Sequence, residues 1–220
     1  MTEIEILNNE LEVGVEYDFE RSKEKIFHIE PKYPLIAASL ELCKKFDVDS
    51  VRNRLMIRLK DILIPEWKEY NKRDNFIKYD AIYFEFGDDS GTPYEAFSYG
   101  IHNMKNYELT SSSLDIGYDY EFGIWEAGIG MVLEAFDILQ PFNYTEELEL
   151  EIDKVRSDRN SGYNEIEIFC HSATRFILNS VFSEADSNGL FSEIGIKSGG
   201  LFIYDVHDGG TGKTPFHLKQ

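Results

Sequence analysis

The sequence predicts an α+β fold in which a mostly antiparallel sheet, built from hairpins, packs against several α-helices. Aromatic and β-branched residues alternate on both sides of a turn-rich run between positions 80 and 103, as in a β-hairpin. Elsewhere, apolar residues recur at helical spacing. With 220 residues, of which 42% are hydrophobic, the chain is expected to form one α+β domain over residues 1–206 and a glycine-rich tail over residues 207–220.

The first 33 residues are expected to contain strands and a connection. Apolar residues alternate in part from Leu11 to Phe19, which favours one or two strands over residues 1–20. Residues 21–33 are charged and mixed, and we expect them to connect these strands to the next element.

Two helices are predicted after this connection. Pro34 suits the start of a helix because its missing N–H would have no intrahelical partner there. Asp47 to Ser50 supplies N-cap residues for the second helix, and Pro65 is expected to end or kink it, with Trp67 as an extension. We expect an antiparallel pair of helices over one face of the sheet. The apolar positions are Leu35, Ala38, Leu42 and Phe46 in the first helix, and Val51, Leu55, Leu59, Ile62 and Leu63 in the second.

The hairpin has a regular strand, a turn and a second aromatic strand. The turn is Gly, Asp, Asp, Ser, Gly, Thr and Pro over residues 87–93, and the second strand runs from Tyr94 to Ile101. In the first strand, one set of side chains alternates with another: Ala81, Tyr83 and Glu85 with Ile82, Phe84 and Phe86.

The rest of the chain is predicted to mix strands and helices. We expect one or two strands within residues 107–122, with a turn at 111–113, and then a helix from Phe122 to Leu139 that Pro141 stops. For residues 145–155 the spacing favours a helix over a strand. After a loop over residues 156–162, a helix carries Ile166 to Val181, and a second hairpin follows, with strands at 193–197 and 201–206.

The charge distribution is strongly uneven. The net charge is −19, so phosphate backbones and anionic membranes are unsuitable partners, and a cationic partner is favoured. Residues 79–153 contain 17 Asp or Glu residues and one basic residue, Lys105. Residues 44–78 contain ten Lys or Arg residues against six Asp or Glu residues. The acidic segment is therefore the expected location of a binding surface.

Tyrosines are interleaved with carboxylates in this acidic segment, a combination that suits a protein interface. Tyrosine rings provide apolar anchors, and carboxylates select for Lys or Arg on the partner. The alternative is an ordinary solvated face of the sheet. The predicted partner-binding residues are Asp88, Asp89, Tyr94, Glu95, Tyr99, Asp115, Tyr118, Asp119, Tyr120 and Glu121.

Short motifs that suggest nucleotide binding or proteolysis do not fit their contexts. Gly212, Lys213 and Thr214 match the end of a phosphate-binding loop, but His207 replaces its first glycine and too few residues follow for the required helix. Residues 89–92, Asp-Ser-Gly-Thr, match the catalytic tetrapeptide of aspartic proteases, which need two such carboxylates. The sequence has one copy, and a hairpin turn explains it.

Cysteine and histidine residues leave a second function open. Cys170 and His171 are adjacent, so they point in different directions and do not pair with each other. His207 and His217, with Asp205 or Cys170, could serve a hydrolase or a metal-dependent enzyme, although their spacing fits no tight ligand signature. The sequence assigns no catalytic residue, no metal ligand and no cofactor.

The leading hypothesis is an acidic inhibitor of a basic protein, such as an immunity protein that covers the basic cleft of a toxin or nucleic-acid enzyme. The alternatives are the enzyme described above and a structural subunit of a larger assembly. Cys43 and Cys170 are too few for a disulfide scaffold, and the acidic N-terminus has no signal-peptide pattern, so the cytoplasm is the expected location. The oligomeric state stays open.

Overall fold

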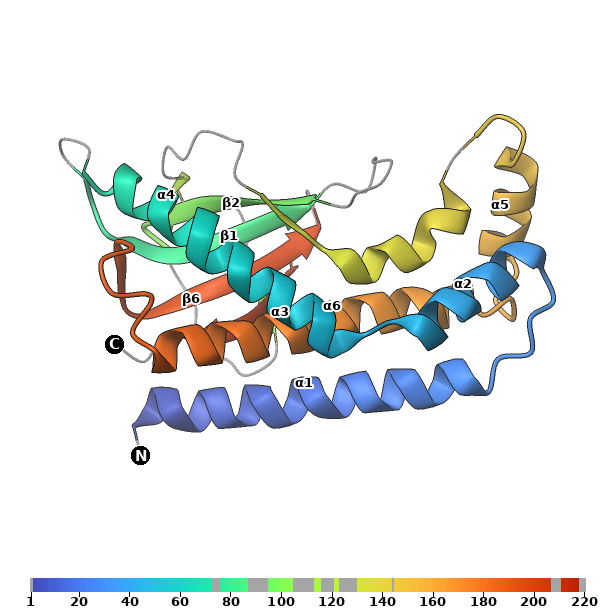
Figure 1. The fold of residues 1–220 in the computed structure, drawn as a ribbon, viewed down its shortest axis with the longest axis horizontal. Coiled ribbons are helices and arrows are strands. Elements are labelled where there is room, and N and C mark those ends of the chain that lie inside the picture. Colours follow the sequence, from blue (N-terminus) through green and yellow to red (C-terminus); the bar gives the residue numbers. More distant parts are fainter. Residues whose placement is uncertain are drawn as a thin grey trace.

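A computed structural model describes residues 2–72, 76–86, 95–104, 113–115, 121–122, 130–143, 145–206 and 211–217. The helices gather on one side of a mixed sheet, and α1 and α6 extend beyond its end (Figure 1). The helical elements are α1 (Glu3–Phe27), α2 (Pro34–Lys45), α3 (Val48–Arg58), the π-helix η1 (Leu59–Leu63), α4 (Ile64–Tyr70), the 3₁₀-helix η2 (Glu134–Phe142), α5 (Glu149–Ser157) and α6 (Tyr163–Ser187).

The strands form one sheet in the order β3-β7-β6-β1-β2-β4, and β5 also pairs with β2. Only the β1–β6 pair among the described pairs is parallel, so the predicted α+β fold with a mostly antiparallel sheet is confirmed. The predicted hairpin is also present, with Tyr83 opposite Tyr99. The strands are β1 (Tyr79–Phe86), β2 (Glu95–His102), β3 (Ser113–Asp115), β4 (Glu121–Phe122), β5 (Gly130–Val132), β6 (Ile196–Val206) and β7 (Thr211–His217).

The main core lies between the sheet and the helices. Phe84 and Phe202 face the helices from the sheet, and both are fully buried. The Phe202 ring lies 4.5 Å from that of Phe182 on α6 and 6.5 Å from that of Trp67 on α4, measured between centroids. A second buried cluster occupies the other face of the sheet and contains Ala81, Tyr83, Ile101, Leu201 and Ile203.

The strand prediction for residues 1–20 is wrong, because these residues begin the 25-residue helix α1. Thr2 and Glu5 form a capping box, each side chain accepting a hydrogen bond from the other residue's backbone N–H. Leu11, Val15 and Phe19 satisfy alternation and also recur every four residues, and the helix buries them along one side. The residues between them point to solvent.

The helix that is expected to end or kink at Pro65 continues through this residue. Its chain widens into η1, where the Ile64 N–H donates to the Leu59 carbonyl, five residues back. Pro65, which has no N–H to donate, follows directly after this π-helical turn, at the start of α4, and Trp67 extends the apolar stripe as predicted. Helices α2 and α3 follow one another across the molecule and do not form the expected antiparallel pair (Figure 1).

Two further helix predictions differ in detail. Helix α2 begins at Pro34 as predicted, but it buries the adjacent face, with Ile36, Leu40 and Cys43. The helix expected over residues 122–139 is only partly present: residues 134–139 are helical, within the 3₁₀-helix η2, whereas Phe122 lies in β4 and residues 130–132 form β5. Residues 130–132 pair with β2 instead of forming a helix. Gly130 permits this close pairing, because a Cβ atom at its position would lie 2.9 Å from the Ala96 carbonyl oxygen. Residues 149–157 are helical, in agreement with the favoured prediction.

The C-terminal segments pair differently from the expectation. Residues 196–206 form one strand with a bulge where a hairpin turn was predicted. At the bulge, the two residue steps from Tyr79 to Ala81 in β1 lie opposite the five steps from Ile196 to Leu201 in β6. Gly199 within the bulge has φ +74°, which glycine adopts readily. The hairpin partner of β6 is β7, so residues 211–217 of the expected tail belong to the sheet.

Candidate functional site

Most of the predicted acidic and tyrosine residues lie outside the described part of the chain: Asp88, Asp89, Tyr94, Tyr118, Asp119 and Tyr120. Glu95 begins β2 and is exposed, and Tyr99 lies four residues along the same strand, half-buried. Burial raises the pKa of Tyr99, and the nearby Glu85 carboxylate raises it further. These two residues are on the same side of one strand, since side chains alternate along it.

The remaining two predicted residues lie on different edges of the sheet. Asp115 ends β3 and Glu121 begins β4, the two outermost strands. The strand order therefore places Asp115 and Glu121 at opposite edges of the sheet.

Ion pairs between distant segments partly neutralise the uneven charge that the sequence shows. Arg54 on α3 forms a bidentate ion pair with Glu134, which belongs to the acidic segment. Arg52 pairs with Glu184 on α6 at 2.7 Å, and Lys68 lies 3.5 Å from Glu193. Such exposed pairs stabilise the fold by only about 0–1 kcal/mol each. These pairs neutralise three of the ten cations of residues 44–78.

Helix α1 carries an exposed surface that the strand prediction concealed. Val13 and Tyr17 are 68% and 62% exposed, and Ile6 is 45% exposed. They lie opposite the buried line through Leu11 and Val15. Figure 1 shows α1 along one edge of the molecule, with α6 on one side and no described element on the other. We call the outer face of α1 the set Ile6, Glu10, Val13, Tyr17, Glu20 and Glu24, which share this side at helical spacing.

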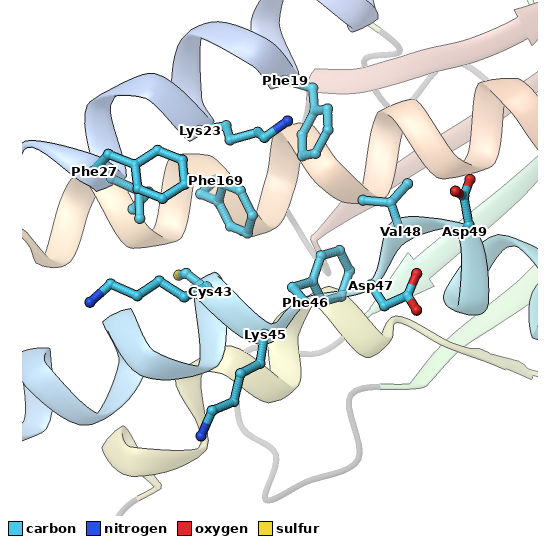
Figure 2. A pocket seen from close by; sticks show the side chains of 12 residues that line it. Phe19, Lys23, Phe27, Cys43, Lys45, Phe46, Asp47, Val48, Asp49 and Phe169 are labelled. Carbon is cyan, nitrogen blue, oxygen red and sulfur yellow. The ribbon is translucent and has the colours of Figure 1, made fainter.

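A hollow of about 430 Å³ opens where α1 passes the junction of α2 and α3 (Figure 2). Its walls are aromatic: the ring centroid of Phe169 lies 5.8 Å from that of Phe19 and 6.1 Å from that of Phe46. Lys23 lies over the Phe19 ring at 5.7 Å. The hollow exists because α2 ends at Lys45 and α3 starts after its N-cap, Asp47. Charged side chains line the hollow beside these aromatic rings: Lys23, Lys44, Lys45, Asp47 and Asp49.

The candidate cysteine and histidine side chains that the structure describes are buried or hydrogen-bonded within the fold. Burial raises the pKa of the Cys170 thiol well above its usual value, which disfavours the reactive thiolate. His171 does not face Cys170, as expected, and its Nδ1 lies 2.6 Å from the Tyr204 hydroxyl. His217 is buried in β7, and His207 lies outside the described residues. Among the side chains that are described, no three His, Cys, Asp or Glu residues group as metal ligands would.

Alkaline pH is expected to destabilise the protein through its two thiols. Burial raises the pKa of Cys43 to about 12 and raises that of Cys170 as well. The unfolded chain then loses these protons at lower pH than the folded chain. Stability is therefore complete below about pH 8.5 and falls above it, by at most about 1.4 kcal/mol per pH unit for each thiol.

Urea unfolding at a series of pH values measures this effect. Replacing both residues, Cys43→Ala and Cys170→Ala, lowers stability at every pH but flattens its decline above about pH 8.5. An equally steep decline in the double variant would show that other groups cause it.

No family model, curated protein or solved structure matches this chain. The helices of the described residues include none with the length and apolar character needed to cross a membrane.

Proposed function

We propose that this chain binds a cationic protein through the outer face of α1 and inhibits it by covering a basic cleft, as an immunity protein does to a toxin such as a nuclease. The observation that carries the proposal is the exposed line of Ile6, Val13 and Tyr17 on a helix rich in carboxylates. Residues 3–20 contain seven Asp or Glu residues and no Lys or Arg.

The two kinds of side chain on this face have different roles in binding. Tyr17 and Val13 provide apolar area that a partner can bury, at roughly 25 cal/mol per Å². Tyrosine suits this role because it combines a large rigid ring with a polar tip. Glu10 and Glu24 flank these anchors and favour Lys or Arg on the partner, whereas Glu20 pairs with Lys23 of the same helix. The net charge of −19 accelerates encounter with a positive surface.

The surface predicted from the sequence is a separate candidate. Strand β2, which carries Glu95 and Tyr99, lies on the opposite side of the molecule from α1 (Figure 1). One compact partner would therefore cover one of the two surfaces. The outer face of α1 is the better candidate, because three large apolar side chains are exposed on it. Cys43 and Cys170 are both free thiols, which supports the cytoplasm as the proposed location.

A matched pair of variants tests this proposal. The full chain is immobilised at about 50 mM salt with lysate from its source cell, and bound protein is released by rising salt. The retained basic protein is then purified and titrated against each variant. We expect Val13→Gln with Tyr17→Gln to weaken binding about 10- to 100-fold, which is about 1.4–2.7 kcal/mol. Leu150→Gln, a change at an 84% exposed position on α5, should leave binding unchanged.

Three results would contradict the proposal. Binding that both variants weaken equally would place the interface elsewhere on the chain. Binding that is insensitive to salt would remove the electrostatic argument. A bound partner that keeps its full activity would show association without inhibition.

A further inference from the structure

A second hollow, also about 430 Å³ in volume, lies between α1 and α6, and more positive than negative side chains line it. Arg21 and Lys25 line it from α1, and Arg175 lines it from α6. The one carboxylate in its lining is Asp18, whose Oδ2 lies 3.4 Å from Nη1 of Arg175. The lining therefore has three cations and one anion, in a chain where acidic residues outnumber basic residues 41 to 22.

Arg21 and Lys25 repel each other, and Asp18 and Glu24, each three residues from Arg21 on the same helix, partly offset this repulsion. Arg21 and Lys25 are four residues apart on one helix, so their side chains are neighbours, and like charges at this spacing destabilise a helix by about 0.2–0.5 kcal/mol. Among the described residues, neither is paired with a carboxylate. A bound anion would turn this repulsion into attraction.

The floor of the hollow is polar as well. The hydroxyl oxygens of Ser22 and Ser172 are 2.6 Å apart and buried where α1 meets α6. Each hydroxyl also donates to a backbone carbonyl three residues earlier in its own helix. Each hydroxyl has one proton and already donates it to a backbone carbonyl, so an oxyanion would have to displace one of these acceptors to bind a hydroxyl. His171 also lines the hollow, and its Nδ1 lies 2.6 Å from the Tyr204 hydroxyl.

We propose that this hollow binds a small oxyanion of the phosphate class, either inorganic phosphate or a phosphate monoester. A phosphate dianion matches the surplus of two positive charges, and its oxygens suit the planar donor fork of Arg21 and the point charge of Lys25. The volume also leaves room for an organic group beside the phosphate, against the apolar side chain of Ile168. This inference does not rest on the proposed partner.

Calorimetric titration of the full chain with inorganic phosphate, at about 20 mM ionic strength, tests the site. We expect saturable binding of one phosphate per chain. The double variant Arg21→Gln with Lys25→Gln should weaken it at least about tenfold. Both side chains are exposed, so the variant should fold, and circular dichroism checks this.

The matched control is Lys23→Gln, which removes the same charge from the same helix. Lys23 points away from this hollow and pairs with Glu20 at 3.1 Å, so binding should not change. A second titration with glycerol phosphate distinguishes the two ligand sources: tighter binding than inorganic phosphate identifies a monoester site. No saturable binding of either ligand, or equal weakening by Lys23→Gln and the double variant, would overturn the proposal.

Discussion

Replacing Trp67 by alanine is expected to lower the free energy of unfolding by about 3–5 kcal/mol, as for other large aromatic residues removed from a core. Trp67 is 0% exposed and lies where α4 meets the sheet. Its ring centroid is 6.1 Å from that of Phe84 and 6.5 Å from that of Phe202. Its Nε1–H donates to the Ser98 hydroxyl at 3.2 Å. The substitution removes both the packing and this buried donor.

Urea unfolding at neutral pH, followed by circular dichroism, measures the loss. Trp67→Phe retains most of the packing but removes the donor, so its expected cost is smaller, about 1–2 kcal/mol. Ile57→Ala on α3 is the surface control, with an expected change within about 0.5 kcal/mol, because Ile57 is exposed. A loss below about 1 kcal/mol for Trp67→Ala would mean that α4 is not packed on the sheet as described.

In each element that the sequence predicts correctly, the apolar residues repeat with a single spacing, either that of a helix or that of a strand. The helix through Ile166 and Val181 and the hairpin of β1 and β2 each follow a single repeat, and each also has strong turn or cap residues nearby. Helix α1 was misjudged because Leu11, Val15 and Phe19 fit both periods. The capping box of Thr2 and Glu5 was the available signal for a helix.

The candidate sites were less predictable than the fold, because they depend on contacts between distant segments. Once α1 is assigned as a helix, spacing alone places Val13 and Tyr17 opposite its buried side. No local pattern, however, places Arg175 beside Arg21, since 154 positions separate them and only the packing of α6 on α1 joins them. The parallel pairing of β1 with β6 is similarly non-local.

Asn8→Ala is expected to lower the free energy of unfolding by about 2–4 kcal/mol. The Asn8 side chain is buried and makes two hydrogen bonds to the backbone of His217 in β7. Its Nδ2 donates to the His217 carbonyl at 2.8 Å, and its Oδ1 accepts from the His217 N–H at 2.9 Å. Alanine leaves two buried backbone groups without these partners, at about 1–3 kcal/mol for each.

This prediction also tests whether the C-terminal residues belong to the domain. If residues 207–220 were a separate tail, Asn8→Ala and the exposed control Asn164→Ala would have the same small effect on urea unfolding. Because β7 pairs with β6 and α1 holds its backbone through Asn8, we expect only Asn8→Ala to destabilise the whole domain. Hydrogen exchange gives an independent measurement: the His217 amide should exchange faster in Asn8→Ala, and amides of β1 should show the same loss of protection where they exchange through global unfolding.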